Sequence, residues 1–155
     1  CKVYPVWNGG GTVRLVILAS NFDVPSAELV NEVQTMIAPT QNQGEGAGIA
    51  PIGHVVTVEG AEAKAVDIAV DITYQQGWAW ADVQSSAEEA IDGYMAELAK
   101  EWDKSDAIVV RVSQIETRLL DLPGVLDVGN TKLGGAAQNM ALDADEIPLR
   151  GVVNG

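Results

Sequence analysis

A strict two-residue alternation runs through Val66-Asp67-Ile68-Ala69-Val70-Asp71-Ile72-Thr73-Tyr74. Branched and aromatic side chains occupy one set of alternate positions, and small or charged side chains occupy the other. Successive side chains of a strand point to opposite faces of the sheet, so this pattern is typical of a strand with one buried and one wet face. The Gln75-Gln76-Gly77 sequence that follows predicts a turn.

A long amphipathic helix is predicted directly after this turn. Its apolar residues recur every three or four positions over about residues 80–102, which is helical spacing. The stripe consists of Trp80, Val83, Ala87, Ile91, Tyr94, Leu98 and Trp102. Further on we expect a strand over 108–112, a helix over 114–121 opened by a Ser113–Glu116 capping box, and strands over 125–131, 139–142 and 146–153.

Upstream of the alternating strand, Gly60-Ala61-Glu62 is the best candidate boundary, because the residue pattern changes there. We expect a strand over 2–6, a strand over 13–19 that is buried on both faces, and a strand over 55–59. Between the last two strands, a helix is predicted to begin at Ser26 as N-cap and to end before Pro39. Its predicted apolar stripe is Leu29, Val30, Val33, Met36 and Ile37.

The predicted fold class is therefore α+β, with two small units over residues 1–60 and 61–155. Each unit should have a mixed or antiparallel sheet packed against one or two helices. The only cysteine, Cys1, excludes an intrachain disulfide and a cysteine-based zinc site. No apolar run approaches 18 residues, so no membrane span is expected. Because the chain does not begin with Met, we expect a piece of a longer protein.

Acidic residues outnumber basic ones by 22 to 9, giving a net charge of −13. This balance argues against DNA, RNA and anionic membranes as partners, since these select for Lys and Arg. Much of the acidity lies on the predicted 80–102 helix, including Glu88, Glu89 and Asp92. Such a face is either simply solvated or meets a basic partner surface.

No stretch of the sequence assembles the parts of a catalytic, metal or cofactor site. The loops at Gly9-Gly10-Gly11-Thr12 and Gly44-Glu45-Gly46-Ala47-Gly48 lack the spacing of phosphate-binding loops and predict turns with positive φ. His54 is the only histidine, and Asp143-Ala144-Asp145-Glu146 lacks the pattern of a calcium loop. We therefore expect no catalytic residue, no metal, no cofactor and no small-molecule substrate. Spacing does not exclude a carboxylate pair for sugar hydrolysis, but nothing nominates one.

The four tryptophans are more informative. Trp80 and Trp102 belong to the helical stripe, so a core position is expected for both. Trp7 and Trp78 lie in predicted turns. An aromatic side chain in a turn either seals the end of a core or anchors a partner.

The order of several short motifs resembles the middle and C-terminal part of the baseplate J-like proteins. These are wedge components of contractile phage tails and also occur in prophages and tail-derived bacteriocins. The motifs are Val3-Tyr4-Pro5-Val6-Trp7-Asn8-Gly9-Gly10-Gly11-Thr12-Val13, Ile49-Ala50-Pro51-Ile52-Gly53, Gly77-Trp78, Leu122-Pro123-Gly124-Val125-Leu126-Asp127-Val128 and Asp145-Glu146-Ile147-Pro148-Leu149-Arg150-Gly151.

The resemblance implies part of a middle domain over 1–60 and a C-terminal domain over 61–155. It implies a structural, non-enzymatic role in the tail baseplate of a virion, after assembly in the host cytoplasm. The implied partners are other wedge proteins and copies of the chain itself. Trp7, Trp78, Glu88, Glu89 and Asp92 are the candidate interaction surface. A carbohydrate- or receptor-binding tail module, with Trp7 or Trp78 as a stacking platform, is the alternative, and a hydrolase is a third hypothesis.

Overall fold

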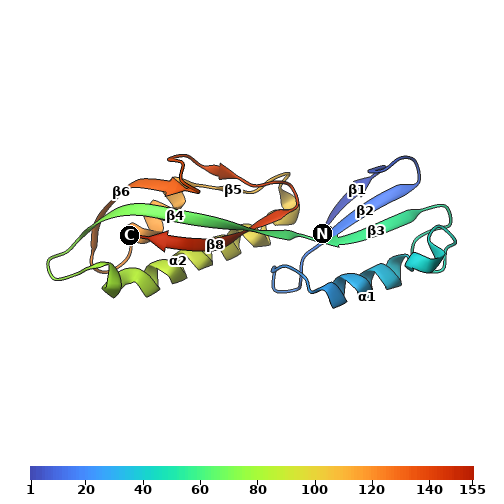
Figure 1. Cartoon of the computed structure of the whole chain (residues 1–155), viewed down its shortest axis with the longest axis horizontal. Coiled ribbons are helices and arrows are strands. Elements are labelled where there is room, and N and C mark those ends of the chain that lie inside the picture. The colour runs from blue at the N-terminus through green and yellow to red at the C-terminus, as the bar shows by residue number, and fades with distance from the viewer. The chain divides into compact units, whose positions relative to one another are not determined.

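The computed structural model describes residues 1–155, which form two compact units: unit 1, Cys1–Glu62, and unit 2, Ala63–Gly155 (Figure 1). Unit 1 has a three-stranded sheet and one α-helix. Unit 2 has a three-stranded sheet, a two-stranded ribbon and two α-helices. The α+β fold class predicted from the sequence is confirmed. None of the helices combines the length and the apolarity needed to cross a membrane.

Unit 1 is a mixed sheet with a helical crossover. The strand order is β1-β2-β3, with β1 antiparallel and β3 parallel to β2. The helix α1 lies in the connection between the two parallel strands, as parallel pairing requires. The elements are β1 (Lys2–Pro5), β2 (Thr12–Ile17), α1 (Ala27–Ile37), the 3-10 helix η1 (Thr40–Asn42) and β3 (Val55–Gly60).

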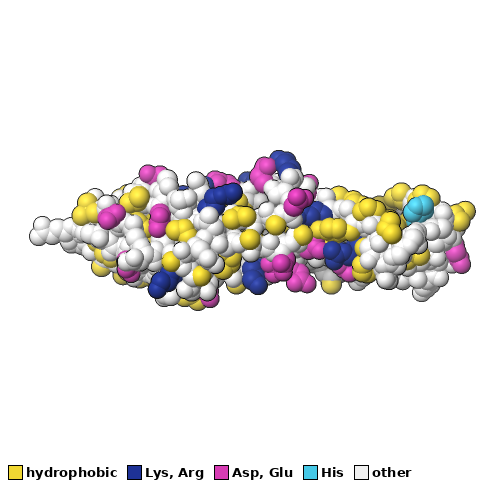
Figure 2. All heavy atoms as spheres, turned by 90° about the horizontal axis from the view of Figure 1, so that it is seen from above, with side chains coloured by type: hydrophobic (Ala, Val, Ile, Leu, Met, Phe, Trp, Pro, Cys, Tyr) yellow, Lys and Arg dark blue, Asp and Glu magenta, His cyan; other side chains and the backbone are white.

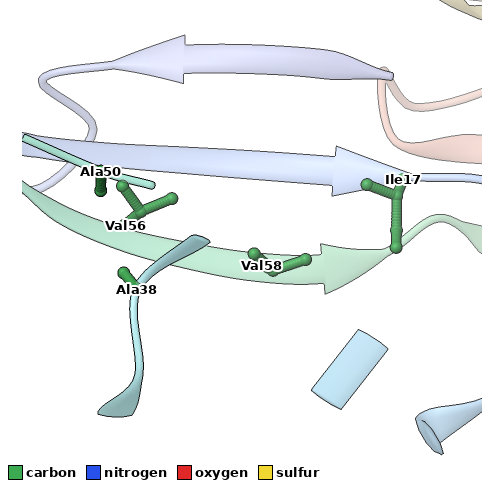
Figure 3. Close-up of a cluster of buried hydrophobic side chains, with 5 residues drawn as sticks. All are labelled: Ile17, Ala38, Ala50, Val56 and Val58. Carbon is green, nitrogen blue, oxygen red and sulfur yellow. The ribbon is translucent and has the colours of Figure 1, made fainter. Parts of the chain in front are cut away.

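The core of unit 1 lies between α1 and one face of the sheet. It consists of Ile17, Ala38, Ala50, Val56 and Val58 (Figure 3). Val13 and Leu15 are half-buried against this cluster. The prediction that β2 is buried on both faces is wrong for its first four residues, which are only half-buried.

Local signals set the two ends of α1. The Ser26 Oγ accepts a hydrogen bond from the Leu29 backbone N–H at 3.2 Å, which confirms the predicted N-cap. The helix ends at Ile37, two residues before Pro39. The predicted apolar stripe is wrong at Met36, whose side chain is 62% exposed.

Unit 2 is organised around the long strand β4, which lies between β6 and β8 in its sheet. β6 is antiparallel to β4, and β5 pairs with β7 as an antiparallel ribbon. The elements are β4 (Glu62–Tyr74), α2 (Trp80–Lys100), the 3-10 helix η2 (Trp102–Lys104), β5 (Val109–Val110), α3 (Val112–Leu120), β6 (Val125–Leu133), β7 (Met140–Ala141) and β8 (Glu146–Asn154).

The alternating pattern of β4 has the predicted consequence. Val66, Ile68 and Val70 are buried, whereas the intervening Asp67 and Ala69 are exposed. The helix α2 presents most of the predicted stripe, with Val83, Ala87, Ile91 and Tyr94 buried. Trp80, for which a core position was expected, and Leu98 are only half-buried. Trp102 lies beyond the helix in η2 and is fully buried, and its Nε1–H donates to the Ala144 carbonyl at 3.1 Å.

The predicted capping box of α3 is wrong. The helix begins at Val112 with Arg111 as N-cap, and no side chain of the predicted box caps it. Instead the Val112 N–H donates to the Oδ1 of Asn139, 3.0 Å away. A residue distant in the sequence thus satisfies one of the free N–H groups at the helix start. Ile115 and Leu119 are buried, as the apolar spacing predicts.

Candidate interaction surface

Trp7 lies in the turn between β1 and β2 and is 44% exposed. Its ring centroid lies 5.9 Å from the Arg14 guanidinium, which also lies 4.6 Å from the Tyr4 ring centroid. The same guanidinium bonds the Glu59 carboxylate at 3.1 Å. The Trp7 ring is therefore held at the margin of an Arg14-centred cluster, within cation–π range, while much of it faces solvent.

Trp78 lies in the turn between β4 and α2 and is 40% exposed. The Gln75 N–H donates to the Gly124 carbonyl at 2.9 Å, which joins this turn to the turn between α3 and β6. The Trp78 ring lies directly on Gly124, and a Cβ at that position would overlap the ring. Gly124 also has φ +89°, which disfavours other residues. One part of the ring therefore seals the end of unit 2, and the rest is exposed.

The three acidic residues nominated on α2 differ in their surroundings. Arg150 of β8 bonds Asp92 through Nε at 2.7 Å and pairs with Glu88 through Nη1 at 3.3 Å. The hydrogen bond to Asp92 raises the pKa of Arg150. Glu88 and Asp92 therefore bind β8 to α2. Glu89 is exposed and forms no ion pair.

Other acidic residues of this region also have partners within unit 2. The Asp82 carboxylate accepts a hydrogen bond from the Ala79 N–H at 2.9 Å, at the start of α2. Glu97 pairs with Arg118, and Glu101 pairs with Lys104 at 2.9 Å. Figure 2 shows basic side chains among acidic ones on the face of unit 2 that it presents. Much of the acidity of α2 is thus neutralised locally.

The glycine-rich loops have the conformational role that the sequence predicts. Gly9, Gly11, Gly44 and Gly46 all have positive φ. In the first loop the Thr12 hydroxyl donates to the Gly9 carbonyl at 2.7 Å and accepts from the Asn8 N–H at 3.0 Å, so the loop binds itself.

The remaining candidates for chemistry lie apart from one another. His54 is exposed just before β3, with its backbone N–H bonded to the Pro51 carbonyl. No group of three or more His, Cys, Asp and Glu side chains is placed to hold a metal ion. A hollow of about 260 Å³ on β4 and β6 is lined by one carboxylate, Asp71, and one amine, Lys132. The Asp71 carboxylate accepts a hydrogen bond from Asn130 at 2.7 Å.

Comparison with known proteins identifies the family. Residues 66–155 match the baseplate J-like protein C-terminal domain, and residues 1–60 match the baseplate J-like central domain. The chain belongs to the baseplate J-like family. It is accordingly a phage or prophage baseplate component.

Two similar proteins come from Bacillus subtilis (strain 168). The phage-like element PBSX protein XkdT is 36% identical over 152 residues, which cover 98% of this chain and 42% of XkdT. The uncharacterized protein YqbT is 37% identical over 153 residues, which cover 99% of this chain and 42% of YqbT. The chain thus spans less than half the length of either relative.

A solved structure shares the fold. A chain of the cryo-EM structure of the anti-feeding prophage baseplate, 6-fold symmetrised, aligns with a TM-score of 0.52 and 11% identity. The alignment covers 90% of this chain and 29% of that chain. At this identity, the likeness concerns the fold alone.

Sequence reasoning missed two features of the candidate surface. The contact between Trp78 and Gly124 joins two turns that are 46 residues apart, and the Pro123-Gly124 pair indicated only the end of a helix. The bridge from Arg150 to Glu88 and Asp92 likewise joins distant elements. Neither feature has a local spacing signal.

Proposed function

We propose that the chain is part of a wedge subunit in the baseplate of a contractile tail, where it acts through protein–protein contacts. Its partners are other wedge proteins and copies of itself. It is incorporated into the virion tail after assembly in the host cytoplasm. Family membership supports this proposal, and so does the use that the chain makes of its polar side chains.

The observation that carries the proposal is that most of the ion pairs join separate structural elements, whereas the hollow on β4 and β6 is lined by only two ionisable side chains, Asp71 and Lys132. Arg150 connects β8 with α2, Arg118 of α3 connects with α2, and Arg14 connects β2 with β3. Such contacts hold neighbouring elements of each unit together. We propose accordingly that the chain has no enzymatic activity, no cofactor and no small-molecule substrate.

The proposed contacts with partners involve the two half-exposed tryptophans, Trp7 and Trp78, and the acidic part of α2. Within that part, Glu89 is the residue free to meet a partner, next to Glu88 and Asp92, which Arg150 holds. Aromatic side chains that are only partly buried are common anchors of protein interfaces. Neither tryptophan lines the hollow on β4 and β6.

The test is deletion of the gene from an inducible prophage, followed by complementation with the full-length protein. We expect the deletion to abolish contractile tails with baseplates in electron micrographs, and complementation to restore them with the protein at the baseplate by gold labelling. Normal tails from the deletion strain would refute the proposal. A glycan array with the purified chain tests the alternative of a carbohydrate-binding module, for which we expect no binding.

A further inference from the structure

Three exposed apolar side chains come from elements that meet at one end of unit 2. Trp78, Leu120 and Leu126 are 40%, 44% and 59% exposed, respectively. Trp78 lies in the β4–α2 turn, Leu120 is the last residue of α3, and Leu126 lies at the start of β6. We call these three residues the Trp78 patch. A grouping of large exposed apolar side chains is a usual mark of an interaction site.

Backbone hydrogen bonds keep the Trp78 patch in place. Gln75 and Gly124 bond at 2.9 Å, and the Trp78 ring rests on Gly124. Leu120 precedes Gly124 by four residues and Leu126 follows it by two. The intervening turn is closed by hydrogen bonds from the Leu122 and Val125 N–H groups. The patch is therefore preorganised, which lowers the entropy cost of binding.

The surroundings of the Trp78 patch are acidic. Residues 74–82 and 119–129 contain Asp82, Asp121 and Asp127 but no Lys or Arg. Arg118, in the last turn of α3, is paired with Glu97 of α2. Asp121 and Asp127 are exposed and form no ion pair. Figure 2 shows hydrophobic (yellow) and acidic (magenta) side chains near the end of unit 2 where β4 turns into α2. This differs from α2, where basic residues neutralise several of the acids.

Asp121 occupies a position at which an acidic residue is unfavourable for helix stability. It is the C-cap of α3. The C-terminus of a helix carries partial negative charge, so an acidic residue there is unfavourable for folding. Residues that break a local stability rule are often functional. A cationic partner would offset both the helix dipole and the Asp121 charge.

We propose that the Trp78 patch docks a separate protein chain that presents an apolar side chain flanked by Lys or Arg. This inference rests on the proposed assembly function and names the chemistry of one partner. The patch does not bind its counterpart on a second copy, because the two acidic rims would then face each other.

The experiment places a photo-crosslinking amino acid at position 78 of the full-length protein in purified tails. We expect a crosslink to another protein, at a segment where Lys or Arg flanks an apolar residue. A crosslink within the same polypeptide is expected as well, because the side chain at position 78 rests on Gly124. A crosslink to a second copy, or to a segment without basic residues, would overturn the inference, as would particles that contain the protein but give no crosslink to another protein. The deletion experiment separates this failure from failure of the proposed function, because protein-containing tails would still form.

Charge reversal provides a second, independent readout. The Asp121→Lys, Asp127→Lys double variant is expected to lower the yield of complete tails at least tenfold. Lysine at position 121 suits a helix C-terminus and should not lower the melting temperature. Lysine at position 127 removes the hydrogen bond that Asp127 accepts from the Val128 N–H at 2.9 Å, so the melting temperature of each single variant is measured to show that the chain stays folded. Glu32→Lys, at an exposed position of α1 in unit 1, is the matched control and should give wild-type yields. Wild-type yields from the double variant would overturn the inference.

Discussion

The side-chain amide of Gln34 pairs with the backbone of Val58 as a neighbouring strand would. The Gln34 Oε1 accepts from the Val58 N–H at 2.8 Å, and its Nε2–H donates to the Val56 carbonyl at 2.9 Å. The same amide donates to the Ala38 carbonyl at 2.6 Å, just beyond α1. Since β3 is an edge strand of its sheet, this buried side chain satisfies backbone groups that would otherwise be free to pair with another chain.

Gln34→Met should therefore destabilise unit 1 by about 2–4 kcal/mol, since it leaves buried backbone groups without partners. Chemical denaturation followed by circular dichroism measures the change. Met36→Gln is the matched control. The Met36 side chain is 62% exposed, so this variant should change the free energy of unfolding of unit 1 by less than about 0.5 kcal/mol. Equal effects of the two variants would contradict the assigned faces of α1.

Helical periodicity predicted the place of α1 but not these two positions. The sequence pattern separates apolar from polar residues, so it assigned Met36 to the core and gave Gln34 no role. The structure reverses this because the edge of β3 requires a hydrogen-bonding partner, which only a polar side chain supplies. The start of α3 shows the same limit, since its N–H partner, Asn139, is 27 residues from Val112.

The elements predicted most reliably were those whose sequence has a short, regular period of apolar residues. The alternation of β4 and the apolar stripe of α2 each depend on one buried face, and that requirement repeats along the element. The candidate surface was predicted less completely, because its determinants are contacts between distant residues. Trp78 was recognised as a turn aromatic, but its contact with Gly124 and the bridging role of Arg150 depend on the tertiary fold.

Gly124→Ala should destabilise unit 2 by about 1–3 kcal/mol, because the new methyl group meets the Trp78 ring and the backbone has positive φ. Thermal melts and tryptophan fluorescence measure the effect. Gly93→Ala is the control, for which we expect an increase in stability instead of a decrease. Gly93 lies within α2 with open space around it, so alanine should stabilise the helix by about 0.5–1 kcal/mol. Stabilisation by both variants would show that Trp78 does not rest on Gly124.

Tyr74→Phe should leave unit 2 as stable as the parent chain or more stable by up to about 1 kcal/mol at neutral pH. The Tyr74 hydroxyl is buried without a hydrogen-bond partner, so its removal costs little. Tyr94→Phe is the contrasting variant. Its hydroxyl accepts a hydrogen bond from the Arg111 N–H at 3.0 Å, and its loss should cost about 0.5–1.5 kcal/mol.

The parent chain and the Tyr74→Phe variant should also differ in stability at alkaline pH. Burial raises the pKa of Tyr74 above its ordinary value of 10.0. The unfolded chain therefore loses this proton at a lower pH than the folded chain does. As the pH rises above about 10, the folded state binds more protons than the unfolded state, and stability falls. Tyr74→Phe should flatten this part of the pH profile, and an unchanged profile would contradict burial of the hydroxyl.

We propose that units 1 and 2 unfold as independent domains. Ala61 is buried and its N–H bonds the Ile17 carbonyl, so the chain stays attached to unit 1 up to the start of β4. Calorimetry should then show two transitions. Gln34→Met should shift one of them and Gly124→Ala the other. A single transition that moves with both variants would mean that the units unfold together.

The acidic part of α2 is best tested at Glu89. Glu89→Lys reverses an exposed charge that forms no ion pair, so the melting temperature should stay within about 2 °C of the parent value. Glu88→Lys with Asp92→Lys would instead place two cations beside Arg150, and we expect that variant to destabilise the contact between β8 and α2. Its assembly phenotype would therefore not separate misfolding from a lost interface. If this part of α2 binds a basic partner, full-length protein with Glu89→Lys should assemble fewer tails while folding normally. The loss should be larger in low-salt buffer than in high-salt buffer, because salt screens the repulsion between the new lysine and the partner. Full yields from a folded Glu89→Lys variant would remove α2 from the interface and leave the Trp78 patch as the remaining acidic docking surface of unit 2.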